Sequence, residues 1–271
     1  MHPLLVDTVE SYLSAVDAAA PGLVEAVYLV GSAALGDWHP SSSDIDIVAV
    51  TAEPCTDDDG RALVAAHAAL AADRPVPHVD GPYVAWADLT IEPATGLHRP
   101  WALDGEIHHD GECFEINPIT WYMLARHGIP VRGPAPHRLG IALDEVARIR
   151  FVVDNLQTYW RRVAEQVIAT LGSTAEADTA ARDAARWTGE ALVWCTLGPL
   201  RLHFTARTGE VTSKSGAASY GLTVLPGALV GVVERALELR GAPELVVHDS
   251  EMRRAAEVID WVIDDVGDTI A

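Results

Sequence analysis

Residues 27–50 read VYLVGSAALGDWHPSSSDIDIVAV, and this stretch decides how the first part of the chain folds. It opens with an apolar run that predicts a strand ending at Val30. Gly31-Ser32 and the small residues after it predict a tight turn and a short helical segment. The alternation from Asp44 to Val50 predicts a second strand. The stretch therefore predicts two strands joined by a turn and a polar loop.

Each part of this stretch has a plausible chemical role. Gly31 has no side chain, so a phosphate group can approach the backbone there. Ser32 stands at a predicted helix N-terminus, where a hydroxyl and exposed N–H groups hold anions. Asp44 and Asp46 lie two apart on a strand, so their carboxylates share one face. Two such carboxylates suit Mg²⁺ bound to nucleotide phosphates. A lone Asp-x-Asp is more often a solvated strand edge. The prediction therefore depends on the strand, Gly31-Ser32 and the two aspartates occurring together.

The rest of the chain divides in two. Up to residue 135, helical and alternating patterns are mixed: helices are predicted at 3–19, 56–72 and 118–127, strands at 26–30, 44–50 and 83–91, and a hairpin at 106–109 and 112–116. After residue 136 only helical periodicity remains, predicting helices at 144–171, 175–207, 227–240 and 249–266. The fold class is therefore α+β: a mixed sheet with flanking helices in domain 1–135, then an all-α helical-bundle domain, 136–271.

Composition and charge narrow the class of function. The 19 basic and 39 acidic residues give a formal net charge of −20, which repels nucleic acid and suits a small cationic partner. The sequence has no basic, apolar leader and no apolar run long enough for a membrane helix. Three scattered cysteines indicate neither disulfides nor a zinc site. We expect a cytoplasmic monomer without a membrane or nucleic-acid partner.

The conjunction of Gly31-Ser32 with Asp44 and Asp46 resembles the nucleotidyltransferase superfamily of the DNA polymerase β type. This resemblance implies a third carboxylate on a later, neighbouring strand. Asp88 in YVAWADLTI is the candidate, because an acid in an apolar strand is costly without a compensating partner. Its role could be that of a metal ligand or of a general base.

In more detail the chain resembles the streptomycin/spectinomycin adenylyltransferases, through GSAALGDWHPSSSDIDIV, WADLTI and TLGPLRLHFTARTGEVTSKSGAA. The family's base is a glutamate where this chain offers Asp88. The family's phosphate-binding arginine and lysine fall on Arg201 and Lys214, which is the only lysine of the chain. The resemblance also points to Trp187 and Glu190 for the acceptor, although Trp187 could equally belong to the core and Glu190 to a solvated face.

The resemblance implies Mg²⁺-dependent transfer of AMP from ATP to a hydroxyl of an aminoglycoside-type or similar cationic acceptor, with release of pyrophosphate. The helical domain would complete the ATP and acceptor sites. Two alternatives remain open from the sequence. One is adenylylation of a protein or of another metabolite. The other is a catalytically inactive nucleotide-binding module, which retention of both Asp44 and Asp46 disfavours.

Overall fold

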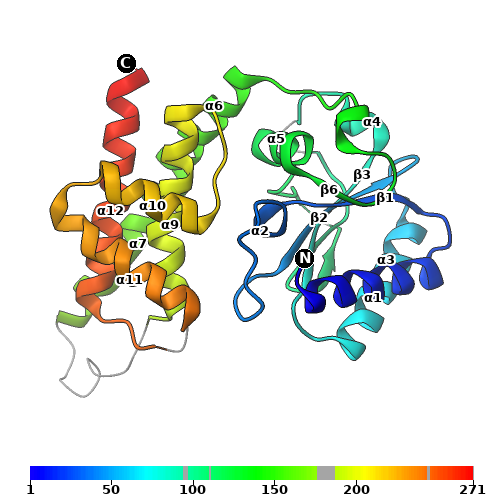
Figure 1. Cartoon of the computed structure of the whole chain (residues 1–271), viewed down its shortest axis with the longest axis horizontal. Coiled ribbons are helices and arrows are strands. Elements are labelled where there is room, and N and C mark those ends of the chain that lie inside the picture. Colours follow the sequence, from blue (N-terminus) through cyan, green and yellow to red (C-terminus); the bar gives the residue numbers. More distant parts are fainter. Residues whose placement is uncertain (94–96, 110, 176–186, 243–244, 271) are drawn as a thin grey trace. The chain divides into compact units, whose positions relative to one another are not determined.

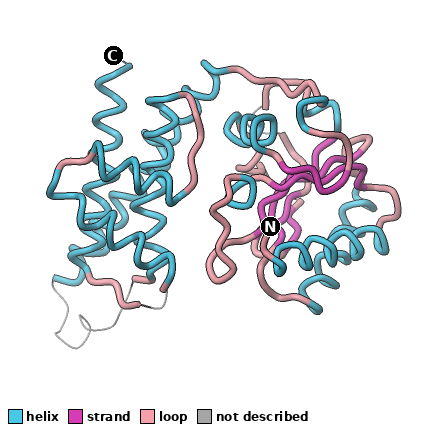
Figure 2. Tube along the Cα trace, viewed as in Figure 1, coloured by secondary structure: helices cyan, strands magenta, loops and turns pink. Residues whose placement is uncertain are grey.

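The chain forms two compact units, Met1–Asp144 and Glu145–Ala271. The computed structural model describes residues 1–93, 97–109, 111–175, 187–242 and 245–270 (Figure 1). The boundary lies slightly later than the one predicted after residue 135. The first unit combines a sheet with helices, and the described part of the second is helical apart from one isolated β-bridge (Figure 2). The predicted α+β class is confirmed.

A six-stranded sheet forms the frame of the first unit. Its strand order is β5-β4-β3-β2-β1-β6, and only β2 and β3 run parallel. The amino ends of β2 and β3 therefore meet at the same edge of the sheet, and residues that precede either strand come close together. The strands are β1 Val24–Leu29, β2 Ile45–Thr51, β3 Val79–Ala85, β4 Trp101–Leu103, β5 Glu106–His108 and β6 Ile129–Arg132.

Helices α1 (Pro3–Ala19) and α3 (Asp57–Asp73) cover one face of the sheet, and α5 (Pro118–His127) lies on the other side (Figure 1). The odd-numbered residues of β2, such as Ile45 and Ile47, pack into the core with α1 and α3. Because successive side chains on a strand point to opposite faces, the even-numbered residues of β2 point away from that core. The pattern DIDIV thus places its aspartates on the face that α1 and α3 leave uncovered.

A buried polar chain ties α1, α3 and β3 together. The Tyr12 hydroxyl lies 2.9 Å from the Tyr83 hydroxyl, which lies 2.7 Å from Nε2 of His67. Burial lowers the pKa of His67 to about 4, because the charged imidazolium would lose its hydration there. The neutral histidine is therefore part of the native core.

Several predicted elements of the first unit have different bounds. The strand predicted at 83–91 is wrong from Trp86 onward, because β3 ends at Ala85 and the four-residue helix α4 (Trp86–Leu89) follows. The hairpin is β4–β5, earlier than predicted, and it turns at Asp104-Gly105, two residues with positive φ. Residues 112–116 form no strand, and β6 was not predicted. The helix starting after Asn117 is confirmed, since that side chain caps α5.

The second unit is a bundle around α9 (Gly189–Thr208). Its helices are α6 Glu145–Asn155, a π-helical segment Leu156–Trp160, α7 Arg161–Ala175, α9, α10 Lys214–Val224, α11 Gly227–Gly241 and α12 Asp249–Ile270. His203 of α9 hydrogen bonds through one ring nitrogen to Tyr220 of α10, at 2.8 Å, and through the other to Asp265 of α12, at 2.7 Å. This buried imidazole joins three helices.

The predicted helices of this unit are confirmed for 227–240 and 249–266. The stretch 144–171 is α6 and α7 with the π segment between them, and α10 was not predicted. The helix predicted at 175–207 is seen from Gly189 onward, and residues 176–186 lie outside the described part. No helix in the described ranges has the length and apolar character needed to cross a membrane.

Candidate active site

The turn after β1 brings Gly31 against Asp46. Gly31 opens the four-residue helix α2 (Gly31–Ala34) with φ +55°, a conformation that only glycine adopts at little cost. A Cβ at Gly31 would overlap Oδ2 of Asp46, so the close approach itself excludes any side chain. The N–H of Val30 donates to the Asp46 carbonyl at 2.9 Å. Ser32 follows in α2 and is half-buried.

Asp44 and Asp46 occupy the amino end of β2. Asp44 immediately precedes the strand, its side chain is half-exposed, and its carbonyl accepts a hydrogen bond from Nε1 of Trp38 at 3.0 Å. Asp46 is partly buried. Ile45 between them is in the core with α1 and α3. Both carboxylates thus lie on the other face of the sheet, as the alternation predicts.

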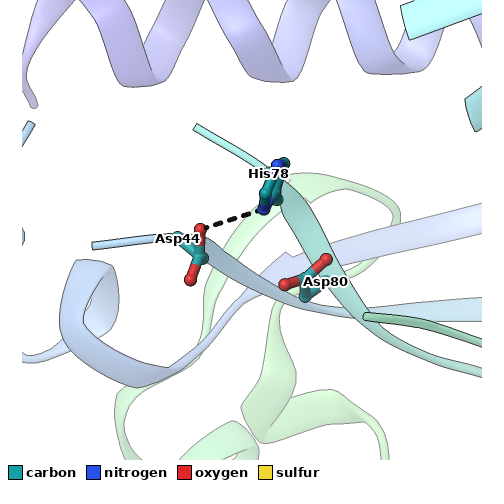
Figure 3. Close-up of side chains that lie close together, drawn as sticks. All are labelled: Asp44, His78 and Asp80. Atoms are coloured by element: carbon teal, nitrogen blue, oxygen red, sulfur yellow. Dashed lines mark ion pairs between the residues drawn. The ribbon is translucent and has the colours of Figure 1, made fainter. Parts of the chain in front are cut away.

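The neighbouring strand adds two groups that the sequence analysis missed. In the parallel β2–β3 register Asp80 lies opposite Asp46, and the hydrogen bond from the Ile45 N–H to the His78 carbonyl (2.8 Å) continues the ladder toward Asp44. Asp44, His78 and Asp80 each offer a ligand atom within 4.8 Å of the others' (Figure 3). The signal was present in the sequence, because His78-x-Asp80 repeats the spacing of Asp44-x-Asp46.

Asp80 is a buried and firmly held carboxylate. Its two oxygens accept hydrogen bonds from the backbone N–H groups of Asp104 and Gly105, at 3.1 and 3.2 Å. Burial raises the pKa of Asp80, and the nearby charge of Asp44 raises it further, while the two backbone hydrogen bonds act in the opposite direction. The hairpin β4–β5 therefore orients the Asp80 carboxylate. A bound cation would stabilise the charged form of this buried group.

A fourth carboxylate, Glu115, lies in the turn before α5. Burial raises the pKa of Glu115 to about 8, and the charges of Asp46 and Asp80 add to the shift. Glu115 is thus near enough to both aspartates for their charges to disfavour its ionised form. From the sequence, residue 115 was predicted only to lie in a hairpin strand.

Asp88 does not lie with these groups. Asp46 pairs with Asp80 and Thr51 pairs with Ala85, a step of five residues or about 16 Å along the strand. Asp88 follows Ala85 by three residues and so lies at the opposite end of β3 from Asp80. There its carboxylate caps α4 by accepting the Ala85 N–H at 2.8 Å. Both of its oxygens also pair with Arg99 at 2.8 Å.

The expectation that Asp88 completes the metal site is therefore corrected. The fully engaged carboxylate of Asp88 holds the end of β3 in place, and Asp80 stands where a third carboxylate was expected. The error came from extending the strand through Trp86, which put Asp88 on a strand face that does not exist.

In the second unit Arg201 and Lys214 lie close together in the fold. Arg201 is on α9, and its Nε donates to the carbonyl of Thr212 at 3.2 Å. Lys214 is the first residue of α10, just after the N-cap Ser213, whose hydroxyl accepts the Gly216 N–H. Lys214 is thus at a helix start, although its Gly/Ser-rich surroundings in the sequence are typical of a loop. Both cations flank the segment that joins α9 to α10.

Trp187 and Glu190 lie before and within the first turn of α9. The Trp187 indole N–H donates to Asp249 Oδ1 at 2.9 Å, and Trp187 forms an isolated bridge with Val247. Glu190 is exposed. It is eleven residues from Arg201, or about 16 Å along α9, and on nearly the same side of the helix. Asp178 and Asp183, which could extend an acidic lining, lie outside the described residues.

The residues at the amino ends of β2 and β3 fit a divalent cation. Carboxylate oxygens are the ligands that hard cations such as Mg²⁺ take, and Asp44, Asp46 and Asp80 supply them from one edge of the sheet. Asp80 also has the hydrogen-bonded support that is usual for carboxylates that ligate metals. The type of these ligand groups and their position at one edge of the sheet both agree with a divalent-cation site.

Comparisons with known proteins agree with this description. Residues 9–79 match the family model of the nucleotidyltransferase domain. The whole chain shares the fold of the spectinomycin adenyltransferase AAD(9) from Enterococcus faecialis, solved with ATP and spectinomycin. The match covers 97% of this chain and 99% of that one, with 12% sequence identity and a TM-score of 0.65. The comparison with curated proteins found no match.

Proposed function

Because the chain is an enzyme that carries a nucleotidyltransferase domain on the fold of an adenyltransferase, we propose that it transfers AMP from ATP to a hydroxyl of a small cationic acceptor, an aminoglycoside or aminocyclitol antibiotic. The observation that carries the proposal is the set of carboxylates at the amino ends of β2 and β3, next to the Gly31 turn. The neighbouring fold, solved with ATP and spectinomycin, supports this choice of substrates.

Within this proposal Asp44, Asp46 and Asp80 would hold the divalent cation, Mg²⁺ in the first instance. When bound, such a cation orients a nucleotide's phosphates and offsets the charge that develops on pyrophosphate. Gly31 leaves the backbone accessible beside Asp46, and Ser32 offers a hydroxyl in α2. We assign Arg201 and Lys214 to binding of the triphosphate, since Arg201 of α9 donates to Thr212, two residues before Lys214 begins α10.

Transfer requires that the acceptor hydroxyl attack the α-phosphorus, that the bond to pyrophosphate break, and that the hydroxyl proton leave. Asp80 is the carboxylate at this site that could accept that proton, because its two backbone hydrogen bonds fix where its oxygens point. Asp88, paired with Arg99, is engaged elsewhere. Glu115 lies near the same aspartates, and its pKa of about 8 means that it is mostly protonated at neutral pH.

Recognition of the acceptor is proposed to rest on charge. The net charge of −20 favours approach of a polycation, and we keep Trp187 and Glu190 as contacts for it. Such an enzyme would act in the cytoplasm, as a monomer, and would confer antibiotic resistance by blocking a hydroxyl of the drug.

A pyrophosphate-release screen tests the proposal. Purified protein, ATP and Mg²⁺ are incubated with spectinomycin, streptomycin and other aminoglycosides one at a time, alongside a pool of lysate proteins. The proposal expects release with at least one antibiotic and none with Asp46→Asn. Release with lysate proteins alone would favour adenylylation of a protein, and an inactive wild type that binds ATP without regard to Mg²⁺ would indicate a nucleotide-binding module.

A further inference from the structure

His78 belongs to a block of four side chains on one face of the sheet. The β2–β3 register places Asp46 opposite Asp80, and the next pair toward the amino ends is Asp44 with His78. Residues two apart on a strand share a face, so both pairs project from the same side. The block therefore contains one imidazole beside three carboxylates.

The position of the imidazole is defined by its neighbours. Nδ1 of His78 lies 3.6 Å from Oδ1 of Asp44 (Figure 3). The same nitrogen lies 3.9 Å from Oδ1 of Asp104. Gly105 brings the β4–β5 turn against the edge of the ring, since a Cβ there would lie 3.4 Å from Cδ2. The same turn donates both N–H groups to Asp80. One hairpin thus supports both His78 and Asp80.

The spacing of the ligand atoms agrees with one shared ion. Metal–ligand bonds of about 2.1 Å place the ligands of one ion roughly 3–4.2 Å apart. Those of Asp44, His78 and Asp80 lie within 4.8 Å of one another, so a small rotation of the side chains closes the set. Nothing in nucleotidyl transfer with Mg²⁺ demands a nitrogen ligand, because Mg²⁺ takes oxygen ligands almost throughout.

We propose that His78 is a nitrogen ligand of the cation at this site, together with Asp44 and Asp80, and that it makes the site select a first-row transition metal over Mg²⁺. Imidazole is a ligand of such metals, and affinity for them rises from Mn²⁺ to Cu²⁺ in a mixed nitrogen and oxygen site. The proposal deepens the proposed function, since the site is the same, but cation binding needs neither nucleotide nor acceptor.

The test uses Mn²⁺ as the probe and tag-free protein, because a polyhistidine tag would itself supply nitrogen. Mn²⁺ affinity is measured by electron paramagnetic resonance without nucleotide, and coordinated nitrogen by electron spin echo modulation from ¹⁴N. Wild type is compared with His78→Gln and with His137→Gln, which removes an exposed histidine of the same unit. Circular dichroism confirms that each variant is folded.

We expect a ¹⁴N signal in wild type and in His137→Gln that is absent in His78→Gln, whose Mn²⁺ affinity falls by about tenfold or more. We also expect wild type to bind Mn²⁺ more tightly than Mg²⁺ in competition. Binding without ¹⁴N modulation, an unchanged His78→Gln, or no Mn²⁺ binding at millimolar concentration would each overturn the proposal. These outcomes are separable from the proposed function, since AMP transfer with Mg²⁺ could persist without the nitrogen ligand, and the nitrogen ligand could be present in a protein that transfers nothing.

Discussion

Replacing Asp88 with asparagine should destabilise the first unit and leave the chemistry intact. Asp88 and Arg99 are mostly buried, with side chains 6% and 16% exposed, and they pair through two contacts of 2.8 Å. Removing one member of a buried pair costs about 3–5 kcal/mol, since the other charge stays buried alone. Asparagine can still accept the Ala85 N–H through its side-chain oxygen, so we expect the lower end, about 3 kcal/mol.

This loss should lower Tm by roughly 6–12 °C for a chain of this size. The measurement is thermal unfolding by circular dichroism, with kcat for pyrophosphate release taken well below the transition. The double variant Asp88→Asn/Arg99→Met should recover part of the lost Tm, because it also removes the unpaired guanidinium. An unchanged Tm with a kcat reduced a hundredfold would refute the reasoning and would indicate that Asp88 takes part in the reaction.

The companion variant is Asp80→Asn, for which the main loss is expected in kcat, with some loss of stability because the asparagine NH2 group cannot accept one of the two backbone N–H groups. Its side chain keeps the shape of the native one, yet it loses the charge needed to hold a cation or accept a proton. We expect kcat to fall by about 10²–10⁴-fold, the range of general acid–base contributions. Equal activity of Asp80→Asn and wild type would remove Asp80 from the site.

Three further variants test other parts of the account. Gly31→Ala should destabilise the fold by about 1–2 kcal/mol, because residue 31 has a left-handed φ, and the new methyl group should displace Asp46. Mg²⁺-dependent ATP binding, measured by calorimetry, should therefore weaken. Unchanged binding would contradict the close approach of Gly31 to Asp46. Lys214→Met should weaken ATP binding by about tenfold, the loss of one hydrogen bond to a charged group. Equal affinities would exclude Lys214 from contact with the phosphates. His67 stays neutral in the folded state down to about pH 4, whereas in the unfolded chain it binds a proton below about 6.5. The free energy of unfolding should therefore fall by about 3 kcal/mol as pH drops from 6.5 to 4. Urea titrations at several pH values check this, and His67→Phe should lose that part of the slope.

The turn at Gly31 and the strand that follows Asp44 were predicted from the sequence and are seen in the structure, because a turn and an alternating pattern are local features. Their partners on β3 could not be predicted as easily. The predicted strand began only at residue 83, after Gly81 and Pro82. A Cβ at Gly81 would overlap the Ile47 carbonyl, so the glycine lets β2 and β3 approach each other.

The misassigned carboxylate shows why local patterns fail at such a point. An isolated acid in the apolar run VAWADLT suggested a functional group, but its place three residues after Ala85 is also that of an acid capping a helix. The pairing with Arg99 depends on a loop eleven residues later, and no spacing rule predicts it. The all-helical character of the second unit, in contrast, followed from periodicity alone.

The most direct test of the central claim is the mass of the acceptor after reaction, measured for wild type and Asp46→Asn with ATP and a divalent cation. We expect an antibiotic that carries one AMP group, with one pyrophosphate formed for each product, and no product with the variant. An acceptor that carries phosphate in place of AMP, or a variant as active as wild type, would contradict the assignment of the β2–β3 site to nucleotidyl transfer.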